Sequence, residues 1–182
     1  MGSWFQIIVD RDVSEADAPL LAERMRGWLS ERGVIGATTQ GWSEGPSFRP
    51  GPAYEETLKE PQPDVLDTPH GFFTLKVGKR LVFSSPDGEV TCRACGSTVD
   101  LGTHGDAWVE AVGRWYEGDD SVPFPCPKCG RPEQLTEWAG EWPWGFGNLG
   151  LEFWDWTPLS ERFVSELTAQ LGHRTVLVRG KL

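Results

Sequence analysis

The residues best suited to chemistry in this 182-residue chain are its cysteines. They form two CxxC pairs, each followed by glycine, and thirty residues separate the pairs. The four thiols are Cys92, Cys95, Cys126 and Cys129. Two cysteines three positions apart on a tight turn direct both sulfurs at one ion, and a second such turn completes the four-thiolate shell that zinc prefers. The spacing therefore predicts one Zn²⁺ ion held by four cysteines.

The glycines that follow the two pairs, Gly96 and Gly130, support this prediction. The residue after the second cysteine has to adopt a positive φ so that backbone N–H groups turn toward the thiolates, and glycine does so without steric cost. Four thiolates leave no coordination position for water or substrate. We therefore expect the zinc to be structural, so that it stabilises the fold and takes no part in catalysis.

Other interpretations of the cysteines are two disulfides, a redox dithiol and four unrelated buried thiols. Residues 1–10 contain neither a basic segment nor a long apolar run, so we expect no signal peptide and a reducing, cytoplasmic location that disfavours disulfides. A thioredoxin-type dithiol normally occurs once, whereas this motif occurs twice, among prolines and glycines. No apolar run approaches the roughly 20 residues needed to cross a bilayer, so no membrane association is expected.

With its two CxxCG motifs, the segment from Glu89 to Arg131 resembles the zinc ribbon class. The resemblance implies the four ligands and nothing about a partner, since zinc ribbons serve unrelated functions. The closing segment, Leu177 to Leu182, is similar to that of bacterial cytoplasmic proteins, which implies no activity.

The charge of the chain bears on its partners. The formal net charge is −10, and four thiolates bound to one Zn²⁺ bring it to about −12. Between Asp87 and Glu133 there are nine acidic and four basic residues. A ribbon with this balance lacks the electrostatic attraction that dominates nucleic-acid affinity, so nucleic acid is disfavoured as a partner.

The two ends of the chain show the same order of elements. We expect a strand at residues 4–9, a helix ending near Arg32 and a strand at 34–39, then a strand at 149–156, a helix between the N-cap Thr157 and the C-cap Gly172, and a strand at 175–179. Two β-α-β units in one small domain pair most economically as an α+β, ferredoxin-like sandwich, with four antiparallel strands and both helices on one face.

The remaining segments are predicted to be additions to this sandwich. Residues 1–40 and 146–182 would form its core, and the proline- and glycine-rich residues 41–71 a surface excursion. Residues 72–135 would form an inserted hairpin, turning at Gly78 and Lys79, followed by the zinc ribbon. A tryptophan-rich connector, residues 136–145, would lead back to the core.

Tryptophan is the second informative feature, with ten residues in the chain. One interpretation is that the large rings simply build a small core. The other uses alternation along the strand at 149–156, which places Trp154 and Trp156 with Glu152 on the face opposite Leu151 and Phe153. Tryptophans on an open face are typical of a recognition surface. The candidate partner-binding residues are Trp108, Trp115, Trp142, Trp144, Trp154 and Trp156.

Catalytic motifs lack their structural context. Residues 41–45 match GxSxG, but Pro46 follows where a nucleophile elbow needs a helix, and residues 145–150 match GxGxxG but precede a strand. The three histidines are scattered, and a structural role is favoured for His173 beside the helix end. We therefore predict no catalytic residues.

Three functional hypotheses follow. The preferred one is a zinc-binding protein-interaction module, such as an adaptor, a regulator or an immunity-type inhibitor, whose acidic surface matches a basic protein partner. The second is a nucleic-acid-associated ribbon protein that would use basic residues of the first helix or the last strand. The third is a binder or hydrolase of sugars or other small molecules, which would use carboxylates among the tryptophans: Glu137, Glu141, Glu152 and Asp155.

Overall fold

The computed structural model describes residues 2–40, 45–60, 71–84, 88–140 and 143–182. The chain divides into two compact units. The first comprises residues 1–83 and 146–182, and the second comprises residues 84–145. Residues 72–83 thus belong to the first unit, whereas the sequence analysis placed them in the insertion. All four cysteines lie in the second unit.

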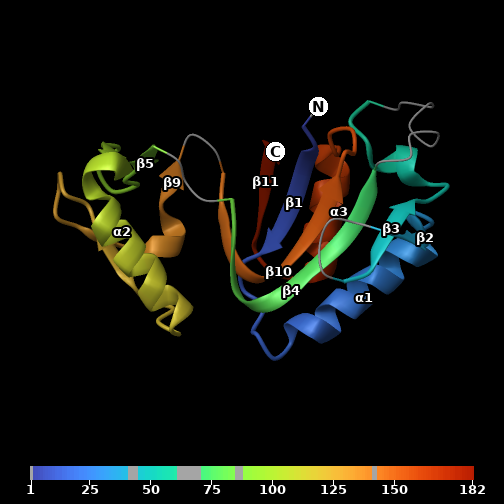
Figure 1. Ribbon diagram of the computed structural model, residues 1–182, viewed down its shortest axis with the longest axis horizontal. Helices are drawn as coiled ribbons and strands as arrows, with labels where there is room; N and C mark the ends of the chain where they lie inside the picture. The colour runs from blue at the N-terminus through green and yellow to red at the C-terminus, as the bar shows by residue number, and fades with distance from the viewer. Residues whose placement is uncertain (1, 41–44, 61–70, 85–87, 141–142) are drawn as a thin grey trace. The chain divides into compact units, whose positions relative to one another are not determined.

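The first unit is built on a six-stranded sheet with the strand order β11-β1-β10-β4-β3-β2 (Figure 1). Its strands are β1 (Trp4–Asp10), β2 (Ile35–Thr39), β3 (Ser47–Pro50), β4 (Phe72–Phe83), β10 (Gly145–Trp154) and β11 (Thr175–Lys181). Strand β1 pairs antiparallel with β10 and β11, and β3 pairs antiparallel with β2 and β4. The fold is therefore mixed α+β, with mostly antiparallel pairing.

The expected ferredoxin-like sandwich is not confirmed. The four expected strands are present, and β1 lies between β10 and β11, but β4 and β3 separate β10 from β2. The added strand β3 comes from the segment that we predicted to be a surface excursion. It joins the sheet because Phe48 pairs in register with Phe73, and both side chains are buried with ring centroids 6.4 Å apart.

The predicted hairpin at Gly78 and Lys79 is also wrong, because residues 72–83 form one strand of 12 residues. Its backbone is irregular rather than reversed. Arg80 has a φ of 53°, and its backbone N–H donates to Asn148 Oδ1 of β10 at 2.8 Å. This contact with the neighbouring strand allows β4 to continue through residues whose local sequence predicts a turn.

Helices α1 (Ala18–Glu31) and α3 (Glu161–Leu171) pack against one face of this sheet (Figure 1). They contribute Leu21, Met25, Leu29, Phe163, Leu167 and Leu171 to the core. Helix α3 begins after Ser160, whose Oγ accepts from Phe163 N at 3.2 Å, and not after the predicted cap Thr157. The predicted C-cap is confirmed, since Gly172 adopts the left-handed conformation.

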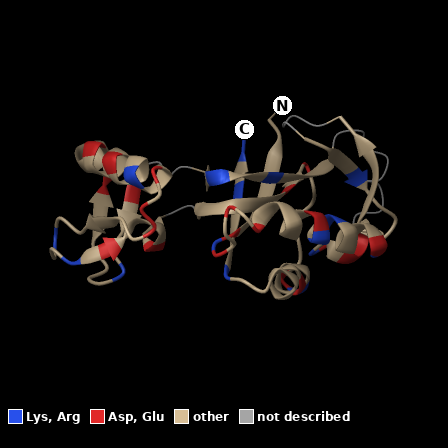
Figure 2. Ribbon diagram, turned by 90° about the horizontal axis from the view of Figure 1, so that it is seen from below, with Lys and Arg blue, Asp and Glu red and all other residues tan. Residues whose placement is uncertain are grey.

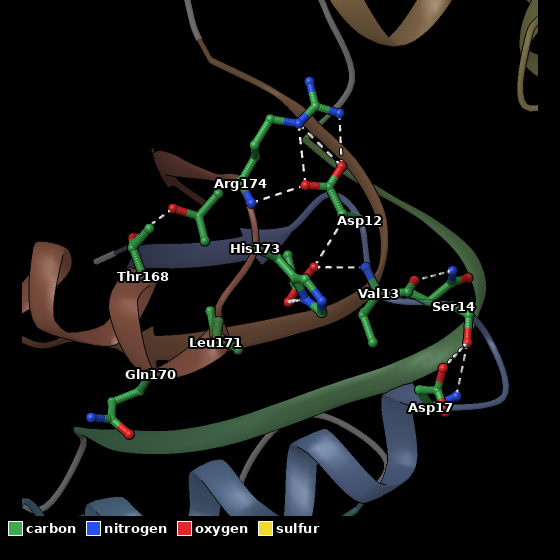
Figure 3. Close-up of polar contacts among 12 residues, drawn as sticks. Asp12, Val13, Ser14, Asp17, Thr168, Gln170, Leu171, His173 and Arg174 are labelled. Atoms are coloured by element: carbon green, nitrogen blue, oxygen red, sulfur yellow. Dashed lines mark hydrogen bonds and ion pairs between the residues drawn. The ribbon is translucent and has the colours of Figure 1, made fainter.

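A polar cluster joins the loop after β1 to the loop before β11 (Figure 3). The fully buried Asp10 accepts from the backbone N–H groups of Asp12 and Val13, and its other oxygen lies 2.8 Å from His173 Nδ1. Arg174 donates to both carboxylate oxygens of Asp12, with a shortest distance of 2.7 Å. The cluster therefore connects the loop between β1 and α1 to the loop between α3 and β11, which supports a structural role for His173.

This cluster predicts a dependence of stability on acid pH. Hydrogen bonding from Arg174 holds the pKa of Asp12 below its ordinary value of 3.8. A lowered pKa stabilises the fold above the unfolded-state value, and that contribution is lost as the pH falls through the folded-state value. We expect Asp12→Asn to lower the unfolding free energy at pH 7 by less than about 1 kcal/mol, because the pair is partly exposed. The difference from wild type should shrink as the pH falls below 3.8 and vanish once Asp12 is protonated in the folded state.

Denaturant unfolding curves at several pH values measure this effect. Glu15→Gln is the matched control, because Glu15 is an exposed carboxylate of the same loop. A constant difference between Asp12→Asn and wild type at all pH values would contradict the prediction.

Among its described residues, the second unit contains two small sheets and one α-helix. Strand β5 (Glu89–Thr91) pairs with β6 (Thr98–Asp100) and β9 (Ala139–Gly140), and β7 (Pro123–Pro125) pairs with β8 (Pro132–Gln134). Helix α2 (Leu101–Tyr116) follows β6 directly. The carboxylate of Asp100 caps it by accepting from Gly102 N at 2.8 Å, and the backbone departs from helical geometry at His104.

Candidate metal centre

Each CxxCG motif forms the turn of a β-hairpin. The first motif joins β5 to β6, and the second joins β7 to β8. The two turns have the same backbone bonds: Gly96 N donates to the Cys92 carbonyl at 2.8 Å, and Gly130 N donates to the Cys126 carbonyl at 2.8 Å. Their φ angles, 70° for Gly96 and 72° for Gly130, confirm the requirement for glycine.

The hairpins bring the four sulfurs together. All Sγ atoms lie within 4.8 Å of one another. The distances across the hairpins are 4.0 Å from Cys92 to Cys129 and 3.9 Å from Cys95 to Cys126. An ion bonded at about 2.3 Å to four tetrahedral sulfurs separates them by roughly 3.8 Å. The cluster can therefore bind a metal ion, and these distances are too long for disulfide bonds.

The thiols differ in their surroundings. The first cysteine of each pair, Cys92 and Cys126, is buried, and the second, Cys95 and Cys129, is exposed. Burial raises the pKa of Cys92, whereas hydrogen bonding from Ser97 lowers the pKa of Cys95 to about 6. Metal ligation requires thiolates, so an ion bound by these cysteines would displace the proton of the Cys92 thiol, whose pKa is raised.

Two acidic residues connect the first hairpin to β8 and to the segment that follows it, and neither was predicted to support the metal site. The backbone N–H of Arg93, within the first motif, donates to Glu133 Oε2 of β8 at 3.1 Å. Its guanidinium lies 2.8 Å from Glu137 Oε2. Glu133 lies four residues after Cys129. The sequence does place the acidic residues Glu133 and Glu137 after the second motif and the basic residue Arg93 within the first. Their spacing matches no standard motif, so it did not predict that they contact each other.

Three of the predicted partner-binding residues form the core of this unit. Trp108, Trp115 and Trp144 are buried. The ring of Trp108 contacts Trp144 and Phe124 edge to face at centroid distances of 5.8 and 5.1 Å, and Trp138 donates its indole N–H to the Phe124 carbonyl. These tryptophans therefore pack the domain, because a small unit needs large rings to bury enough apolar surface. Trp142 lies outside the described residues.

The expected exposure of Trp154 and Trp156 is wrong for Trp156. Strand β10 ends at Trp154, and Asp155 has a φ of 54°, so the alternation of side chains stops there. Trp156 turns into the helix-covered core, where its ring lies 4.4 Å from Tyr54 between centroids. Trp154 is half-buried and donates to Glu152 Oε2 at 2.9 Å.

The structure also shows where the remaining sequence motifs and candidate carboxylates lie. Residues 145–150 of the GxGxxG string lie within β10 and open no helix. Among the carboxylates, Glu152 is buried and bonded to Trp154, and Asp155 accepts from Trp4 N at 2.8 Å. Ser43 of the GxSxG string, His70 and Glu141 lie outside the described residues. Within the part of the chain that the structure describes, no helix is long and apolar enough to span a membrane.

The fold and the site together define an α+β protein with a four-cysteine cluster on paired hairpin turns that can hold a metal ion. Comparison of the chain with protein-family models, with curated proteins and with solved structures finds no match.

Proposed function

We propose that the chain is a non-enzymatic zinc-binding protein in which one structural Zn²⁺ stabilises residues 84–145. The observation that carries the proposal is the near-tetrahedral spacing of the four sulfurs. Zinc is the preferred ion for four thiolates on paired turns, and four protein ligands leave no position for substrate. The position of the cysteines supports a structural role for the ion, since they lie on the two hairpins around which the core of the second unit packs.

The metal proposal is tested by native mass spectrometry of the intact chain and by cobalt substitution. We expect one zinc ion per chain, and a Co²⁺-substituted protein with the thiolate charge-transfer and ligand-field absorption of a tetrahedral four-sulfur site. An iron ion, or a cobalt spectrum of an octahedral site rich in oxygen or nitrogen ligands, contradicts the proposal.

We further propose that the second unit binds a basic protein partner through the outer face of α2. This face carries Val109, 68% exposed, and Tyr116, 46% exposed, with the half-buried Val112 between them. The spacings of three and four residues place these side chains on one stripe of the helix. Large exposed apolar side chains in a row are typical of an interaction surface.

The charge around this stripe indicates the kind of partner. The exposed acids of α2 and its C-cap are Asp106, Glu110 and Glu117. The sequence of the second unit contains eleven acidic and four basic residues, and acidic positions predominate in this unit in Figure 2. A partner with apolar side chains set among lysine and arginine complements this surface, whereas a nucleic-acid backbone is repelled by it.

A site-specific photo-crosslinker placed at residue 109 tests the partner proposal. We expect it to capture one basic protein in cells, and Tyr116→Ser to reduce the yield at least about fivefold. The same crosslinker at Leu20, which is 77% exposed in the first unit, is the matched control. Equal capture of that protein from both positions, or crosslinks to nucleic acid, would overturn the partner proposal. Neither result would contradict the zinc proposal.

A further inference from the structure

A cavity of about 560 Å³ lies in the first unit, where β1 begins and β11 ends. Its walls include Trp4, Gln6, Trp156, Pro158 and Arg179. This volume is within the range of cavities that hold small molecules, and such sites combine mostly apolar walls with a few polar groups. The cavity is distinct from the cysteine cluster, and it is independent of the zinc and partner proposals.

One wall of this cavity carries an unsatisfied donor. Trp156 is only 4% exposed, and its indole nitrogen has no hydrogen-bond acceptor among the described residues. The neighbouring amide of Gln6 is engaged with other groups: its oxygen accepts from Leu159 N, and its nitrogen donates to the carbonyls of Trp156 and Thr157. A buried donor without an acceptor costs free energy and requires an explanation, such as a bound molecule that supplies the acceptor.

The opposite wall carries positive charge. The strand register places Arg179 opposite Gln6 and Lys181 opposite Trp4, so these residues share one face of the sheet. Within the described residues, the Arg179 guanidinium has no carboxylate partner, and Lys181 Nζ lies 5.2 Å from the centroid of the Trp4 ring. In a chain with a net charge of −10, two cations beside an aromatic cavity are a local exception.

We propose that this cavity binds a small aromatic carboxylic acid. The Arg179 guanidinium would accept the carboxylate in a charge-assisted hydrogen bond, which is the strong class of such bonds. The exposed ring of Trp4 and the ring of Pro158 offer flat apolar surfaces for an aromatic ring. The indole N–H of Trp156 donates to an oxygen of the ligand. Among the described residues, Asp155 forms no ion pair with Arg179, and its Oδ1 accepts from the backbone N–H of Trp4.

Indole N–H resonances in ¹H–¹⁵N spectra of the full chain provide the test, with indole-3-acetate as the probe. The signal of Trp156 is assigned by its loss in Trp156→Phe, which keeps a ring in the core. We expect indole-3-acetate to shift the Trp4 and Trp156 signals with a Kd below about 1 mM, and Arg179→Gln to weaken binding at least about tenfold. Trp156→Phe should weaken it about fivefold, measured on the Trp4 signal.

Matched probes and variants separate the contributions. The neutral analogue 3-methylindole lacks the carboxylate and should bind weakly and equally to wild type and Arg179→Gln. Acetate lacks the ring and should cause no shift of either indole signal. Arg131→Gln, at an exposed position of the second unit, controls for net charge. The proposal is overturned if indole-3-acetate leaves both signals unchanged at about 5 mM, or if both arginine variants weaken binding equally.

Discussion

Replacement of Cys126 by serine will unfold residues 84–145 and abolish zinc binding. Cys126 is one of the two buried ligands and lies 3.9 Å from Cys95 between sulfurs. A serine hydroxyl is not a thiolate, and structural zinc contributes about 10–16 kcal/mol of apparent binding free energy in small zinc-binding peptides. Since whole domains are stable by only about 5–15 kcal/mol, the loss exceeds what this small unit can tolerate. Backbone ¹H–¹⁵N spectra and native mass spectrometry measure the two effects.

The matched control is Arg131→Gln, in the same hairpin turn. Arg131 contributes its backbone carbonyl to Cys126 N at 3.0 Å, and its side chain is exposed. We expect this variant to retain one zinc ion and wild-type spectra, because glutamine preserves the backbone bond. Treatment of the wild-type protein with a chelator should remove the zinc and unfold residues 84–145, as Cys126→Ser does. A Cys126→Ser chain with the dispersed spectrum of a folded second unit would refute the structural role of the metal.

The second large effect is expected in the first unit, at Phe153 of β10. This side chain is fully buried beneath the helices, and its ring lies 5.1 Å from Phe73, 5.0 Å from Trp156 and 6.2 Å from Phe163 between centroids. Phe153→Ala removes these contacts and leaves a cavity, so we expect the unfolding free energy to fall by about 3–5 kcal/mol. Denaturant unfolding followed by near-UV circular dichroism measures the change.

Two further variants test the cause of this loss. Phe153→Leu fills part of the cavity and should cost about half as much. Val77→Ala, on β4 at a side chain that is 40% exposed, should change stability by less than about 0.5 kcal/mol. If Phe153→Ala and Val77→Ala have equal effects, the aromatic cluster is not the stabilising core of the first unit.

The four-cysteine cluster could be predicted from the sequence because its determinants are local. A CxxCG turn fixes two sulfurs and one positive φ within five residues, and neither depends on the rest of the chain. The helices α1 and α3 and the strands β1, β2, β10 and β11 were predictable for a related reason. Their apolar periodicity and caps, such as Gly172, are properties of short windows of sequence.

The strand order of the first sheet could not be predicted in this way. Strand β3 lies among prolines and glycines, and β4 passes through Gly78 and Arg80, so local signals favoured loop and turn. Pairing with strands distant in the chain outweighs these preferences, because Phe48 and Phe73 bury their rings only when the segments are in register. The result is a sheet of six strands in place of four.

The environments of the tryptophans also depend on tertiary structure. Alternation along β10 assigned Trp156 to the open face, but the backbone at Asp155 reverses that assignment. Conversely, the outer position of Val109 and Tyr116 on α2 follows from which helical face packs against Phe124 and Trp144. The sequence by itself determined the four-cysteine cluster and the segments that become helices, because those signals act over a few residues. Only the tertiary structure decided strand order and side-chain exposure, since both depend on contacts between segments far apart in the chain.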